Sequence, residues 1–83
     1  MLEQQEQWRV TWQVQGEQPE VEVMNRWADA WALAQPWPEE RGEDGGWLYT
    51  LRADALSAFQ NGAESVVVAW TRNGRRQTVL SRA

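Results

Sequence analysis

Apolar and polar residues alternate at the start of the chain with the period of two that is typical of a β-strand. The alternation covers residues 8–14 and places on one face Trp8, Val10, Trp12 and Val14. A turn-forming segment, residues 16–19, follows, and residues 20–23 alternate again. The first part of the chain therefore predicts a β-hairpin, with the two tryptophans on its inward face.

After this hairpin, the spacing of apolar residues changes to the period of an α-helix. Apolar residues recur at positions i, i+3, i+4 and i+7, namely Trp27, Ala30, Trp31 and Ala34. This spacing makes one apolar helical stripe. Asn25 is a good residue to cap the start of such a helix, and Pro36 ends it.

Residues 36–46, with the sequence PWPEERGEDGG, carry prolines, glycines and carboxylates and no apolar periodicity. This composition predicts an exposed acidic loop. Trp37 is the one tryptophan in it, held between two prolines.

The second half of the chain predicts a strand, a short helix and a second hairpin. Residues 47–52 alternate like a strand, and residues 53–60 favour a helix that is capped by Asp54 and ended by Asn61 and Gly62. Residues 64–71 are rich in β-branched side chains, and residues 75–82 can pair back onto them through Asn73-Gly74. Asn-Gly is a strong signal for a two-residue hairpin turn.

The order ββα-βαββ predicts an α+β protein, with about five strands in a small antiparallel sheet and one main helix plus a short second helix on one face. With 83 residues the chain has room for a single domain, residues 1–83. We expect residues 1–6 to be a disordered N-terminus.

The second hairpin raises a question about its two faces. A two-residue turn would pair Trp70 with Gln77, Val68 with Val79 and Val67 with Leu80, which leaves apolar residues on both faces. One interpretation is a central strand that is buried on both sides. The other is that one face is core and the opposite face contacts a partner, a second copy of the chain included.

The composition limits the catalytic and metal-binding chemistry that is open to the chain. The chain has no cysteine and no histidine, every basic residue is arginine, and the net charge is −4. The usual general base, thiol nucleophile, imidazole metal ligand and Schiff-base lysine are therefore missing. Only carboxylate chemistry remains, and its candidates lie in a solvated loop: Glu39, Glu40, Glu43 and Asp44. We expect no enzyme activity, no cofactor and no metal site.

Charge and cysteine usage also bear on location and partners. Acidic proteins do not attract nucleic acids or anionic membranes in general, so both are disfavoured as partners. The polar, acidic first residues are unlike a secretory signal, and no window is apolar enough to span a membrane. We expect a cytoplasmic protein.

The segment TRNGRRQ, residues 71–77, gathers Arg72, Arg75 and Arg76 around the predicted turn. In the simplest interpretation these arginines keep an exposed turn soluble. They could instead bind the phosphates of a nucleic acid, with Arg82 as a further candidate and with Trp70 stacking on its bases. They could also bind carboxylates on another protein, which a planar guanidinium holds bidentately.

The chain has seven tryptophans, and one small sheet with two helices is too small to bury all of them. We therefore expect Trp37, and either Trp47 or Trp70, to be candidates for exposure. Exposed Trp and Arg dominate protein interfaces, so the sequence favours a non-enzymatic protein-binding module that occupies a partner's surface. Its general profile, short, acidic, cysteine-free and α+β, resembles accessory proteins and inhibitors that are carried by phages and mobile elements. A small nucleic-acid-binding protein and a structural subunit of an assembly such as a phage particle are the alternatives.

Overall fold

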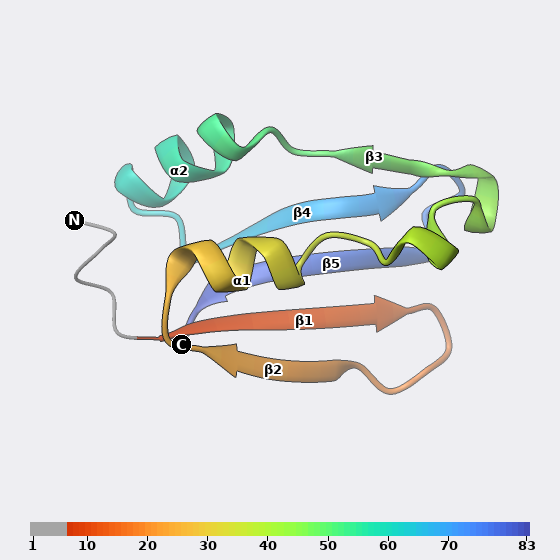
Figure 1. Ribbon diagram of the computed structural model, residues 1–83, viewed down its shortest axis with the longest axis horizontal. Coiled ribbons are helices and arrows are strands. Elements are labelled where there is room, and N and C mark those ends of the chain that lie inside the picture. The colour runs from red at the N-terminus through yellow and green to blue at the C-terminus, as the bar shows by residue number, and fades with distance from the viewer. Residues whose placement is uncertain (1–6) are drawn as a thin grey trace.

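The computed structural model describes residues 7–83, which form two layers, a sheet and the helices that cover one of its faces (Figure 1). The predictions for residues 1–6 fall outside the described residues. The elements follow one another as β1 (Trp8–Val14), β2 (Glu20–Met24), α1 (Trp27–Leu33), β3 (Trp47–Tyr49), α2 (Arg52–Gln60), β4 (Ser65–Thr71) and β5 (Arg76–Arg82). The predicted α+β architecture is confirmed.

All five strands join one antiparallel sheet in the order β2-β1-β5-β4-β3. The last strand, β5, thus lies in the middle, between the first strand and β4. Both edges are short, five residues for β2 and three for β3, which limits edge-to-edge pairing with other chains.

The core lies between the sheet and the helices. The indole of Trp8 is fully buried and meets Trp27 of α1 and Phe59 of α2 edge to face, with ring centroids 5.0 and 4.9 Å away. Ala30 and Ala34 are buried, so the predicted helical stripe faces the sheet, with its two tryptophans packed around the core. Small alanines let α1 approach the sheet closely while the large rings fill the space beside it.

Arg82 closes this core at the end of β5. Its guanidinium lies over the rings of Trp8 and Phe59, with its central carbon 5.7 and 5.5 Å from their centroids. It also donates hydrogen bonds to the backbone oxygens of Phe59 (2.7 Å) and Ala63 (3.3 Å). The side chain therefore ties the end of β5 to the last turn of α2 and to the residues that follow it.

The predicted register of the second hairpin is correct only next to the turn. Trp70 pairs with Gln77 as predicted, but an irregularity between Val67 and Ala69 shifts the strands, so that Val67 pairs with Val79. The extra residue, Val68, makes a bulge. The predicted pairs Val68 with Val79 and Val67 with Leu80 are wrong for this reason.

The interpretation of β4 as a strand buried on both sides is also wrong. Both helices pack on the same face, since Trp27 of α1 and Phe59 of α2 meet over Trp8. Val67, on the opposite face, remains 36% exposed. No helix or strand of the described residues covers that opposite face, which we call the outer face.

Two element boundaries differ from the sequence prediction. The first helix begins after Arg26 rather than Asn25, and α2 begins at Arg52, inside the predicted strand. Asp54 therefore lies in the first turn of α2 and does not cap it. The terminator at Asn61 and Gly62 is confirmed, with Gly62 in the left-handed conformation at φ 98°.

Candidate functional site

A groove of about 370 Å³ lies on the helix side of the sheet, between the β1–β2 hairpin and the segment that follows α1. It exists because α1 ends at Leu33 and leaves the far end of β1 uncovered. Apolar side chains line it: Trp12, Val14, Leu33 and Trp37. Concave sites with aromatic walls and a few polar groups are typical of binding sites.

Carboxylates line the same groove. They come from the hairpin and from the loop, as Glu17, Glu20, Glu22 and Glu40. The register explains two of them, because Glu20 pairs with Trp12 and Glu22 with Val10, and paired residues point to the same face of a sheet. The groove is therefore both aromatic and acidic.

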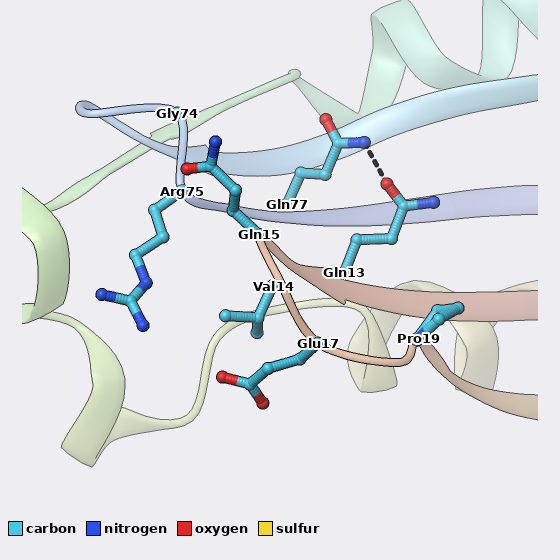
Figure 2. Close-up of a pocket in the computed structure, with 8 residues that line it drawn as sticks. All are labelled: Gln13, Val14, Gln15, Glu17, Pro19, Gly74, Arg75 and Gln77. Atoms are coloured by element: carbon cyan, nitrogen blue, oxygen red, sulfur yellow. Dashed lines mark hydrogen bonds between the residues drawn. The ribbon is translucent and has the colours of Figure 1, made fainter.

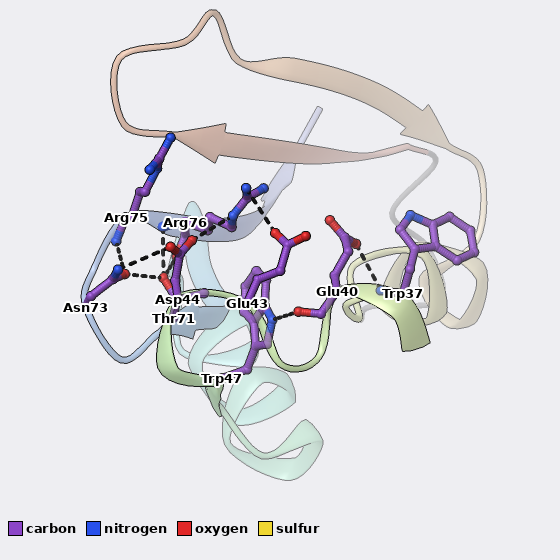
Figure 3. Close-up of polar contacts among 9 residues, drawn as sticks. All are labelled: Trp37, Glu40, Glu43, Asp44, Trp47, Thr71, Asn73, Arg75 and Arg76. Carbon is purple, nitrogen blue, oxygen red and sulfur yellow. Dashed lines mark hydrogen bonds and ion pairs between the residues drawn. The ribbon is translucent and has the colours of Figure 1, made fainter.

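Trp37 stands at this groove with 54% of its surface exposed. Its backbone is fixed, because its N–H donates to the Glu40 carboxylate (3.1 Å) and its carbonyl accepts from the Glu40 N–H (2.9 Å). Pro36 before it is buried, and Pro38 after it begins a 3-10 turn, Pro38–Glu40. Figure 3 shows its indole apart from the charged cluster of the same loop.

That charged cluster joins the loop to the β4–β5 turn, and we call it the loop clasp: Glu43, Asp44, Asn73 and Arg76 (Figure 3). Arg76 bonds Asp44 (2.7 Å) and Glu43 (2.9 Å), while the Asn73 amide donates to Asp44 (3.2 Å). Nearby, the Trp47 indole N–H donates to the Glu40 carbonyl (2.9 Å). These bonds hold the acidic loop against the sheet.

Contacts within the loop clasp shift the pKa values of Asp44 and Arg76. Partial burial of Asp44 by itself would raise its pKa, but hydrogen bonds from Arg76 and Asn73, with the charges of Arg76 and Arg75, lower this pKa below its usual value. The hydrogen bond to Asp44 raises the pKa of Arg76, against the effect of its burial. Both groups are therefore held in their charged forms.

The backbone of the clasp follows from the sequence Asp44-Gly45-Gly46. All three residues have positive φ, 53°, 86° and 90°. Glycine adopts this region freely, and Asp is among the few other residues that tolerate it. The glycines of the loop thus serve to aim the Asp44 carboxylate at Arg76.

The structure separates the three predicted arginines. Arg72 and Arg75 are exposed at the turn, whereas Arg76 is half-buried in the clasp and also lines the groove. Arg75 borders a second pocket of about 430 Å³ between the two hairpin turns (Figure 2). There the side-chain amides of Gln13 and Gln77 bond each other.

The two predicted tryptophans lie on different sides of the sheet. Trp37 is at the groove, but Trp70 pairs with Gln77 on the outer face and is half-buried. The five candidate residues therefore do not form one surface. Trp37 and Arg76 share the groove, Arg75 borders the second pocket, Arg72 lies against Gly45 and Gly46, and Trp70 is on the outer face.

Sequence reasoning missed the hairpin carboxylates Glu17, Glu20 and Glu22 as part of the site. The segment Glu20-Val21-Glu22-Val23 showed that glutamates and valines lie on opposite faces, but not which face the helices cover. In the structure the glutamates share the helix side and the valines share the outer face, where Val21 is 52% exposed.

Within residues 7–83, no group of three or more carboxylates is arranged to hold a metal ion. None of the helices described there is long and apolar enough to cross a membrane. The chain matches no protein-family model, no curated protein and no solved structure.

Proposed function

We propose that this chain is a small, non-enzymatic protein-binding module that acts by occupying part of a partner's surface. The observation that carries the proposal is Trp37, an indole held with more than half of its surface exposed at an acidic groove. Its backbone is fixed by Glu40 before any partner arrives, so little conformational freedom is lost on binding. Tryptophan in such a position is the residue type most enriched among interface hot spots.

The lining of the groove defines the chemistry of the partner. Indole faces attract cations, and the groove brings Trp12 and Trp37 together with four glutamates. An arginine or lysine side chain can lay its apolar stem along the rings and direct its charged end to the carboxylates. The proposed partner is therefore a protein that presents a basic side chain.

Nucleic acid fits the same end of the molecule poorly. Of the three turn arginines, Arg76 already neutralises Asp44 and Glu43, which leaves Arg72 and Arg75 for phosphates. Glu17 lines both the groove and the pocket that Arg75 borders, and together with the other groove glutamates it would repel a polyanion. A catalytic role is no part of the proposal, because the chain lacks His, Cys and Lys. The proposal includes a cytoplasmic location and a role of the type that phage and mobile-element accessory proteins perform.

The first test is a selection from a random peptide-display library with the immobilised full chain as bait. We expect the enriched peptides to carry more Arg and Lys than the library, because the groove supplies carboxylates and indole faces. Trp37→Ala should weaken the binding of the enriched peptides at least about tenfold, as expected of a central hot spot. Glu22→Gln should weaken it less.

Tyr49→Ala provides a matched control, since Tyr49 is an aromatic side chain 47% exposed outside the groove. It should leave the binding of the same peptides unchanged, and circular dichroism should show all three variants folded. Enrichment of acidic peptides, or equal binding by the Trp37→Ala variant, would contradict the proposal. So would tight binding of single- or double-stranded oligonucleotides at physiological salt that Arg72→Ala and Arg75→Ala abolish.

A further inference from the structure

The outer face of the sheet has a regular composition that the strand register defines. Three rows of side chains cross strands that are neighbours in the sheet, and we call these twelve positions the outer grid. The central row is Val21, Thr11, Val79 and Val67. One flanking row is Val23, Arg9, Ser81 and Ser65, and the other is Gln13, Gln77, Trp70 and Leu48.

The outer grid is apolar where it is exposed and carries almost no charge. Val21, Val23, Leu48 and Val67 keep between 36% and 52% of their surface in solvent. Arg9 is the one charged residue among the twelve, and no carboxylate of the described strands belongs to the grid. In a chain of net charge −4 this face is set apart from the acidic groove on the other side.

We propose that the outer grid is a homodimer interface, in which two copies pack sheet against sheet around a two-fold axis along the central row. Like-charged proteins repel, so a second copy can approach closely only through a face that is free of carboxylates. The outer grid meets this condition, and both copies offer it at once. The proposal concerns a different surface from the groove and does not depend on the proposed function.

With this two-fold axis, each flanking row of one copy faces the other flanking row of the second copy. A rotation about the central row reverses the strand direction and keeps the strand order, so Arg9 of one copy faces Gln13 of the other, and Ser65 faces Trp70. The guanidinium then meets an amide oxygen that can accept its hydrogen bond. The large indole meets a small serine, and the β-branched central row packs on itself.

The area of the outer grid is of the size expected for the interface of a weak dimer. Each position on one face of a sheet covers about 30 Å² of plane, and ten of the twelve positions, all except Val23 and Leu48, have a grid residue opposite them, so the contact covers about 300 Å² on each copy. Side-chain relief adds to this, and the total falls near the lower end of specific interfaces, at roughly 1,000 Å². We therefore expect a reversible dimer with a Kd on the order of 10 μM.

Sedimentation equilibrium of the full chain, from low micromolar to several hundred micromolar, tests the dimer. Val67→Lys places a charge in the central row and should raise the Kd at least about tenfold, because two charges would then be buried face to face. Leu51→Lys is the matched control, since Leu51 is 68% exposed and lies outside the grid. It makes the same change of charge and should leave the Kd within about twofold. A monomer at the highest concentration, or equal effects of the two variants, overturns the proposal.

Chemical crosslinking tests the two-fold axis, and the absence of cysteine from the chain removes any background. Facing sheets lie about 10 Å apart, farther than a disulfide usually spans, so a short bis-maleimide is the suitable reagent. Thr11→Cys on the central row should crosslink fastest, Gln13→Cys more slowly, and Ala32→Cys, exposed on α1, least. Crosslinking of the Gln13 variant as fast as the Thr11 variant, or of the Ala32 variant as fast as either, overturns the arrangement.

Discussion

At the scale of single residues, the seven tryptophans play different roles that depend on where the helices stop. Trp8 lies under both helices and is fully buried, whereas Trp12, two positions further along the same face, lies beyond the end of α1 and lines the groove. The buried indole N–H groups of Trp8 and Trp27 have no acceptor within residues 7–83. Among the described residues, their rings stabilise the fold through apolar burial and through contacts with neighbouring rings and with Arg82.

This difference predicts unequal effects of the same substitution. Trp8→Ala should lower the free energy of unfolding by about 3–5 kcal/mol, because it empties the centre of the core. Trp12→Ala should lower it by only about 1–2 kcal/mol, since part of that indole is already in solvent. Urea unfolding followed by far-UV circular dichroism measures both, and an equal or larger loss for Trp12 would show that the groove is closed in solution.

At the scale of elements, the sequence predicts what depends on neighbours along the chain and misses what depends on distant contacts. The limits of β1 and the apolar stripe of α1 follow from periodicity and are confirmed. The bulge at Val68 is invisible in a run of β-branched residues, because any of three valines could supply the extra position. It moves every residue before it in β4 to the opposite face from the one predicted.

The residues of the candidate site show the same limit on what local sequence can predict. The sequence predicts the exposure of Trp37, because its proline neighbours keep it out of any helix or strand. The sequence does not distinguish Arg76 from the exposed arginines of the turn, since its partner Asp44 lies 32 residues earlier in the chain. Local pattern carries no information on such a pair, although Asp44-Gly45-Gly46 does signal an unusual backbone.

The clasp predicts a pH dependence of stability with a definite sign. The pKa of Asp44 is lower in the folded protein than the value of about 3.9 of an unperturbed Asp. The stabilisation is therefore fully present above about pH 4 and is lost as the pH falls through the lower folded pKa. Asp44→Asn should reduce stability at pH 7, and its difference from wild type should shrink steadily as the pH falls below about 4, because the wild-type carboxyl takes up its proton there.

Asparagine is the suitable replacement, because it tolerates the positive φ of position 44 and so changes the charge without straining the backbone. Glu39→Gln is the control, an exposed carboxylate of the same loop. Urea midpoints of the three proteins across this pH range measure the effect. A difference between wild type and Asp44→Asn that stays constant as the pH falls would show that the clasp does not depend on the carboxylate charge.

At the scale of the whole molecule, the two faces differ in chemistry. The helix side holds the acidic groove and the clasp, and the outer face holds the nearly uncharged grid. A dimer through the outer grid would direct its two grooves away from each other, toward separate sites on one partner or on two. Two linked weak contacts can exceed either alone by a factor of about 10² or more. The two proposals are independent, and together they describe a bivalent binder.

Dimer formation has a further consequence for the thermal stability of the chain. A second copy that binds only the folded state stabilises it by mass action, and between about 0.5 and 50 times the Kd in total concentration this gain is about 1 kcal/mol per chain. For a domain of 83 residues each kcal/mol raises Tm by about 4–8 °C. With a Kd on the order of 10 μM, Tm should rise by several degrees between about 5 μM and 500 μM protein.

The Val67→Lys variant should show a Tm that is nearly independent of concentration, and Leu51→Lys should behave like the wild type. A wild-type Tm that stays constant over this range would mean that the folded chain gains nothing from a second copy, and the acidic groove would then act as a single site.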